Sequence, residues 1–287
     1  MAAPAGNASN ARTERAVDHW LLPVTFVGTY VLVLLGVYTA AIGAGLMCDA
    51  RWPLCDGAVF GLFPANWPSF VEWFHRLVAM LVGFAIIGSW WLVWRRGAPR
   101  RATWAFTVAI GLLPVQIWLG AQTVLTYEIL VLTAHFVTAL IIFSGVLAGV
   151  VWAYGPPPHR IPIRSLLAAS LLAMLLIVPL KPLFLVVHTG PVQVIYYALG
   201  LGIITATLLT VIRVRASEMS DSRIVAFAAG GAAVCMALQL VAGRLMRSDL
   251  VYLIDWSATA GMGVLLVLAL LTSYGSRSRS FRSLAST

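Results

Sequence analysis

The sequence predicts an all-α integral membrane protein, with eight transmembrane helices arranged as two pseudo-repeated four-helix bundles. Of its 287 residues, 61% are hydrophobic and only 10% are charged, whereas a soluble domain carries roughly 25% charged residues. The apolar runs are long and uninterrupted, which favours helices over a barrel whose strands would alternate. An internal repeat divides the chain into halves. This composition excludes a soluble globular protein, a disordered chain and a secreted disulfide scaffold.

Eight apolar segments each have about the 20 residues that a membrane-crossing helix needs. They cover residues 20–41, 70–94, 103–125, 130–152, 165–187, 193–212, 224–243 and 251–274. The predicted organisation is a tail at 1–19, an N-terminal bundle at 20–152 with an external loop at 42–69, a C-terminal bundle at 165–274 and a tail at 275–287. We expect no cleavable signal peptide, because the first 19 residues are polar and a full-length apolar run follows them.

The basic residues predict the orientation. The chain has 19 Lys and Arg against 10 Asp and Glu, a formal net charge of +9. Fourteen of the bases fall in the two tails and in alternate loops: Arg12, Arg15, Arg95, Arg96, Arg100, Arg101, Arg160, Arg164, Arg213, Arg215, Arg223, Arg277, Arg279 and Arg282. The positive-inside rule then places both termini in the cytoplasm, and we expect the plasma membrane of a prokaryote. Topology accounts for the charge, with attraction to membrane lipids as a by-product, so we expect no nucleic-acid partner.

The external loop at 42–69 carries Cys48 and Cys55. A loop of this length among tight connections is usually functional or folded onto the protein. Disulfides persist outside the cell, and a bond between these two cysteines would close a short loop. Two interpretations stay open: a structural staple, and a redox-active pair beside a reaction site. Cys235 lies inside an apolar span, where we interpret it as a small buried hydrophobe.

Two histidines, His75 and His135, lie inside apolar helices, each about five residues from the outer end of its span. An ionisable residue there is costly and indicates function. At 1.5 Å per residue, both lie roughly 8 Å below the outer surface. Two imidazoles at one depth on different helices can ligate a haem iron from opposite sides. The alternative is that each is a core residue with a hydrogen bond to a neighbouring helix.

Glu72 and Arg76 flank His75 and lie four residues apart, so they share a helix face. Arg76 is placed to pair with a haem propionate at the outer edge. The alternative is a Glu72–Arg76 ion pair at the membrane interface, which contributes little by itself.

The halves look like a duplication in which the second half has lost its ligands. Residues 71–76 align with 192–197, and residues 132–135 with 253–256. Tyr196 and Trp256 then occupy the positions of His75 and His135, with the same spacing of 60 residues. Trp cannot ligate iron, and one Tyr opposite a Trp is not a bis-axial haem site. Pro179, Lys181 and Pro182, near the outer end of the fifth span, are the feature most similar to the helix breaks of transporters. The alternative is that Lys181 extends its amine to the interface.

The external motif resembles the haem A synthase family. It consists of GLMCDARWPLCDG at 45–57 followed by EWFHR at 72–76. Leu119-Gly120-Ala121 follow on the third span, and His135 follows on the fourth. The motif match covers about residues 24–150. The resemblance implies an oxidoreductase that converts the carbon-8 methyl of haem O into the formyl group of haem A, through two hydroxylations and loss of water, for haem–copper oxidases.

The resemblance also implies roles for individual residues. It implies that His75 and His135 hold the substrate haem, that Cys48 and Cys55 pair, and that Glu72 acts in catalysis. The family's C-terminal half usually binds a haem b through two further histidines, and Tyr196 and Trp256 depart from that pattern. The implied partners are a haem O synthase, terminal oxidase assembly factors and an external electron-transfer partner. A homo-oligomer is left open.

The proposed chemistry leaves the oxygen source open. Ligation by two histidines leaves the iron no free position for oxygen, so either one histidine leaves during turnover or water supplies the formyl oxygen. Two other function classes stay under consideration. One is a haem-binding carrier or assembly factor without the oxidation. The other is a small-solute transporter. Two observations disfavour it: the two repeats have the same topology, and the helices lack paired breaks.

Overall fold

The computed structural model describes residues 6–47, 58–59, 63–64, 66–126, 128–155, 162–181, 189–217, 219–245 and 248–284. Within these ranges, eight helices are long and apolar enough to cross a membrane. This confirms the all-α fold class and identifies a multi-pass membrane protein.

Each half supplies four of the spanning helices. The first half contains α1 (Gly6–Ala41), α2 (Trp67–Arg95), α3 (Arg100–Leu125) and α4 (Ile129–Tyr154). The second contains α5 (Ile163–Ile177), α6 (Gly190–Arg215), α7 (Ser222–Leu245) and α8 (Asp249–Leu284). The short elements are the 3-10 turns η1 (Ala44–Leu46) and η2 (Val178–Leu180) and the antiparallel strands β1 (Ala58–Val59) and β2 (Phe63–Pro64).

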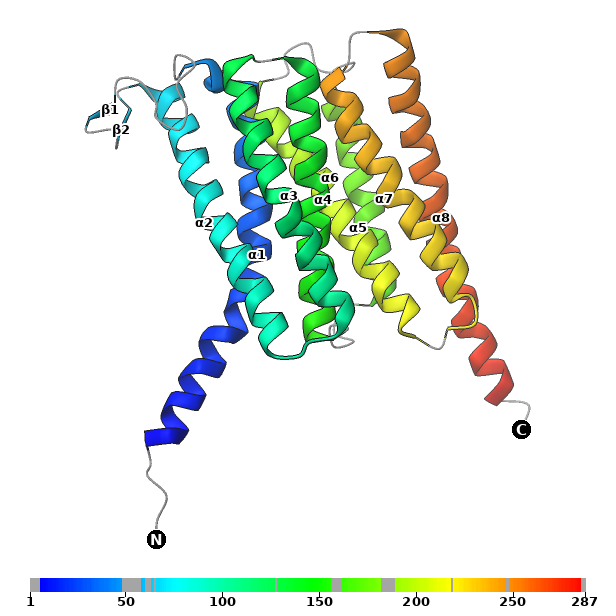
Figure 1. The fold of residues 1–287 in the computed structure, drawn as a ribbon. Helices are drawn as coiled ribbons and strands as arrows, with labels where there is room; N and C mark the ends of the chain where they lie inside the picture. The colour runs from blue at the N-terminus through cyan, green and yellow to red at the C-terminus, as the bar shows by residue number, and fades with distance from the viewer. Residues whose placement is uncertain are drawn as a thin grey trace.

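The helix contacts repeat from one half to the other. In the first half, α1 packs against α2 and α4, and α3 packs against α2 and α4. In the second half, α5 packs against α6 and α8, and α7 packs against α6 and α8. The halves meet where α1 and α4 contact α6, and where α4 also contacts α7 (Figure 1). This arrangement supports the predicted pair of pseudo-repeated bundles.

Several helix ends differ from the prediction. The predicted tails are largely helical, because α1 begins at Gly6 and α8 continues to Leu284. The start of α1 and the end of α8 lie at the same end of the bundle (Figure 1). Helix α2 begins earlier than expected because the side chain of Asn66 caps it, accepting a hydrogen bond from the Ser69 amide at 2.9 Å.

The fifth span is shorter than predicted. Helix α5 ends at Ile177 and continues as the 3-10 turn η2, which contains Pro179. Proline has no amide N–H to donate and crowds the preceding turn, so the α-helical pattern stops there. The end of the predicted span, residues 182–187, lies outside the described part of the chain.

Packing is tightest along the centre of each bundle. In the second half, small residues on α7, including Ala228, Ala229 and Ala232, are fully buried and let neighbouring helices approach closely. In the first half, Phe106 of α3 packs directly onto the backbone of α4 at Gly149, where a Cβ atom would lie only 2.7 Å from its ring. Large apolar side chains such as Phe84 and Phe227 are exposed on the outer face, which is the surface that lipid covers.

Candidate functional site

The structure brings His75 and His135 together inside the first bundle. His75 lies in the third turn of α2, and His135 lies in the second turn of α4. The two imidazoles are close enough for their charges to interact. The helices that carry them are the second and fourth of the half, as predicted.

A glycine on the preceding helix makes room for each imidazole. A Cβ atom at Gly36 of α1 would lie 3.1 Å from Nε2 of His75, and one at Gly120 of α3 would lie 3.2 Å from Cε1 of His135. At these distances the neighbouring ring must give way by a few tenths of an ångström before a Cβ atom fits. The two glycines therefore allow the rings to lie close against α1 and α3.

The nitrogens of His135 are unequally satisfied. The amide nitrogen of Gln116, on α3, lies 3.3 Å from Nε2 of His135. Nδ1 of His135 and Oε1 of Gln116 are buried with no hydrogen-bond partner. Buried polar atoms normally have hydrogen-bond partners. These two atoms therefore fit a site in which a bound ligand supplies the missing contacts. Gln116 was not singled out from the sequence, although an amide in the middle of an apolar span is a signal of function.

Glu72 and Arg76 form the ion pair that the sequence left as an alternative. Nε of Arg76 donates to Oε1 of Glu72 at 2.8 Å, with the side chains 16% and 6% exposed. The pair is largely buried one turn from His75, so it is not the solvent-screened surface pair that contributes little. Pairing with Glu72 fixes the Arg76 guanidinium on the same face of α2 as the carboxylate.

The donor set around the histidines fits a haem better than an isolated metal ion. Within the described ranges, no group of three or more His, Cys, Asp and Glu side chains is placed to hold a metal ion. Protein zinc sites take three or four such ligands, whereas a haem iron takes its two axial ligands from the protein and four from the macrocycle. Two imidazoles on different helices of one bundle suit a haem iron.

Cys48 and Cys55, the cysteines of the external loop, lie outside the described residues.

In the second half, a buried ion pair lies beside the positions that correspond to the histidines. Nζ of Lys181 is 2.7 Å from Oδ2 of Asp255, and each side chain is 1% exposed. The same amine donates to Oγ1 of Thr259 at 2.5 Å and lies 4.7 Å from the centre of the Trp256 ring. The alternative that Lys181 extends its amine to the interface is wrong, because the side chain is buried and the amine has a carboxylate partner inside the bundle.

These residues do not fit a haem b in the second half. Trp256 offers no ligand to iron, and the amine of Lys181 lies against its ring. The hydroxyl of Thr259 extends the polar network by donating to Oε1 of Gln239 at 3.0 Å. Tyr196 is close enough to Asp255 for their charges to interact. Among the residues described here, side-chain polar contacts of Lys181, Asp255, Thr259 and Gln239 occupy this region, and Tyr196 and Trp256 do not form a pair of axial ligands.

Residues 19–191 match the family model described as Cytochrome oxidase assembly protein. The match covers more than half of the chain, and the chain belongs to this family. It spans both histidines, Glu72 and the external cysteines. The resemblance to haem A synthases is thereby confirmed.

Several curated relatives match parts of the chain. A Heme A synthase from Symbiobacterium thermophilum is 36% identical over 127 residues, which is 42% of this chain and 39% of that protein. A Heme A synthase from Bacillus licheniformis is 28% identical over 126 residues, 43% of this chain and 41% of that protein. A Protoheme IX farnesyltransferase from Halobacterium salinarum is 35% identical over 133 residues, 46% of this chain and 28% of that protein. The chain thus spans less than half the length of these relatives.

Proposed function

We propose that this protein is an oxidoreductase that binds haem O between His75 and His135 and oxidises its carbon-8 methyl group to a formyl group, giving haem A. The observation that carries the proposal is the histidine pair, brought together on α2 and α4 with a glycine behind each ring. The names of the two kinds of relatives, Heme A synthase and Protoheme IX farnesyltransferase, both refer to haem. A haem is therefore the substrate class that the relatives share.

The proposed roles follow from the contacts. His75 and His135 hold the substrate iron and so fix the macrocycle edge-on between the helices. Glu72 is the proton acceptor for the oxidised methyl, because it is the buried carboxylate closest in sequence to a ligand, and Arg76 holds it in place. With water as oxygen source, conversion of the methyl to a formyl group releases four electrons and four protons. Because the second half does not fit a haem b, these electrons pass to an external acceptor.

The cellular setting is part of the proposal. We place the protein in the plasma membrane of a prokaryote with both termini in the cytoplasm, so that the histidines and the cysteine loop lie toward the outside. Cys48 and Cys55 act there as a structural staple or as a redox pair. The partners are a haem O synthase that supplies the substrate and the assembly factors of a haem–copper oxidase that receive the product.

The test is to produce the full chain in cells that make haem O and to extract the pigments. We expect haem A or its hydroxylated intermediate with the wild type, and neither with His75→Ala or His135→Ala. Tyr196→Phe and Trp256→Phe are the matched controls, because they change the corresponding positions of the second half and should keep the product. Folded wild-type protein that holds haem O and forms no oxidised haem would contradict the proposal.

A second candidate is a haem-binding carrier or assembly factor without the oxidation. The polar network in the second half favours it, because Lys181, Asp255 and Trp256 do not suit a haem b that would carry electrons inside the protein. In the same assay a carrier would hold haem O through His75 and His135 and release it unchanged. Adding protohaem and farnesyl diphosphate to the purified protein also tests the reaction that the haloarchaeal relatives are named for.

A further inference from the structure

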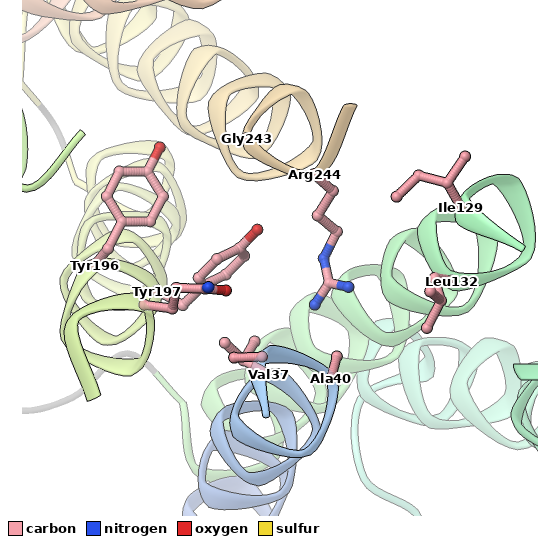
Figure 2. A pocket seen from close by; sticks show the side chains of 10 residues that line it. Val37, Ala40, Ile129, Leu132, Tyr196, Tyr197, Gly243 and Arg244 are labelled. Atoms are coloured by element: carbon pink, nitrogen blue, oxygen red, sulfur yellow. The ribbon is translucent and has the colours of Figure 1, made fainter. Parts of the chain in front are cut away.

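A cavity of about 300 Å³ lies between the two halves, where α1 and α7 end and α4 and α6 begin. Its wall is apolar on the first half, at Val37, Ala40 and Leu132. The second half contributes Tyr197 and the side chain of Arg244, which extends from α7 into the cavity (Figure 2). A volume of about 300 Å³ is at the lower end of the range for small-molecule sites.

Arg244 is a cation held between aromatic rings. Its guanidinium carbon lies 4.3 Å from the centre of the Phe136 ring and 5.4 Å from the centre of the Tyr197 ring. The Tyr197 hydroxyl donates to the carbonyl oxygen of Leu240 at 3.0 Å, which fixes that ring. The two rings come from different halves, so the guanidinium lies at the junction between them.

No acidic side chain in the described part of the chain forms an ion pair with Arg244; Glu72 pairs with Arg76, and Asp255 pairs with Lys181. Its Nε atom is buried with no hydrogen-bond partner. A guanidinium at this depth is costly unless an anion accompanies it, and aromatic rings compensate only in part. The Tyr197 hydroxyl is a neutral hydrogen-bonding neighbour of the guanidinium. Among the described residues Arg244 therefore lacks an anionic partner, and the apolar wall opposite suits an anion carried on an apolar body.

The haem ligand of the first half lies beside this cavity. Leu132 lines the cavity, Phe136 packs on the guanidinium, and His135 lies between them on α4. Arg244 is close enough to His135 for their charges to interact. A haem bound at His135 carries two propionate carboxylates on an apolar ring. It would therefore supply both an anion for Arg244 and an apolar surface for the opposite wall. Arg76 is already paired with Glu72.

We propose that Arg244 binds a propionate of the haem held by His75 and His135, so that the second half contributes a substrate-binding residue to the site of the first. This inference rests on the proposed function, because it requires a haem at the two histidines. Arg244 is a positioning residue that sets how the macrocycle is rotated about its iron, and it does not touch the reacting methyl.

The test compares protohaem with its dimethyl ester, in which both propionates are uncharged. The full-length protein is placed in discs of zwitterionic lipid and titrated with each compound, following the Soret band. The wild type should bind protohaem about tenfold or more tightly than the ester, the effect of one charge-assisted contact. Arg244→Gln should weaken protohaem binding by about the same factor and leave ester binding unchanged. Arg244→Lys should retain part of the preference.

The control is Arg164→Gln. Arg164 also lies over an aromatic ring, 3.9 Å from the centre of Tyr274, and donates to the carbonyl oxygen of Ser273, but it lies at the opposite end of the bundle. This variant should keep the wild-type preference for protohaem. If Arg244→Gln does not fold, Arg244→Lys carries the comparison and should lose part of the preference for protohaem. Equal affinity of the wild type for the two compounds would overturn the inference in either case.

Other outcomes separate this inference from the function on which it rests. A preference that survives Arg244→Gln, or an equal loss for both compounds, overturns the role of Arg244 alone, provided that the Soret band depends on His75 and His135. Lipid phosphate that copurifies with the wild type and is lost in Arg244→Gln, with the haem preference unchanged, assigns the site to a lipid and also overturns it. If the wild type binds neither compound through the histidines, the proposed function falls as well.

Discussion

The ion pair between Lys181 and Asp255 provides a quantitative test of the second half. The perturbation is Lys181→Met, which keeps much of the length of the side chain and removes its charge. It also removes the donor to Oγ1 of Thr259. The Asp255 carboxylate then stays buried without a cation.

The expected cost follows from burial and geometry. The amine and the carboxylate are 2.7 Å apart, and each side chain is 1% exposed, so neither charge is screened by solvent. Removing one partner of such a pair costs about 3–5 kcal/mol of unfolding free energy, because the remaining charge stays buried. Removing both charges, in Lys181→Met with Asp255→Leu, should be neutral or stabilising by about 1–4 kcal/mol. The double variant should therefore be clearly more stable than the single one.

The assay is unfolding of the full chain in mixed detergent micelles by increasing dodecyl sulfate, followed by circular dichroism of the helices. A cost below about 1 kcal/mol for Lys181→Met would contradict the buried, unscreened pair, since an exposed pair contributes no more than that. A double variant as unstable as the single one would also refute it, because the loss would then come from packing and not from the unpaired charge.

Three further changes test the packing around the site. Gly120→Ala places a Cβ atom 3.2 Å from the ring of His135 and should weaken haem binding several-fold in a Soret titration, with little change in stability; unchanged affinity would contradict the role given to this glycine. Gly149→Ala drives a Cβ atom to 2.7 Å from the Phe106 ring and should cost about 1–3 kcal/mol of unfolding free energy in dodecyl sulfate, so a neutral result would show that the helices separate readily. Tyr30→Phe removes a 2.7 Å hydrogen bond from α1 to the backbone of α6 and should cost about 0.5–1.5 kcal/mol in the same titration; a larger loss would mean that the ring packing had changed as well.

The spanning helices were predictable because lipid imposes a simple rule on sequence. About 20 apolar residues are needed per crossing, and the eight runs of this chain meet that requirement one by one. The helix ends were less predictable. The 3-10 turn at Pro179 and the cap at Asn66 depend on local hydrogen bonds that hydropathy does not describe.

The candidate site was predictable in part. His75 and His135 were selected because an ionisable residue in lipid is costly, and their depth could be counted from the span ends. The direction in which a side chain points depends on helix rotation and packing, which the apolar pattern of a nearly all-apolar helix does not specify. The partner of Lys181 and the position of Arg244 between two halves were therefore not predicted. The roles of Glu72, Cys48 and Cys55 stay predictions.

The central claim is that the two histidines hold a haem whose methyl group is oxidised. The most direct measurement is mass spectrometry of the haem recovered after haem O and an electron acceptor are supplied to the purified protein. We expect a haem in which one oxygen replaces two hydrogens of the methyl group. The conversion should be lost in His75→Ala and His135→Ala and kept in Tyr196→Phe. Recovery of unchanged haem O from folded wild-type protein whose Soret band depends on both histidines would contradict it.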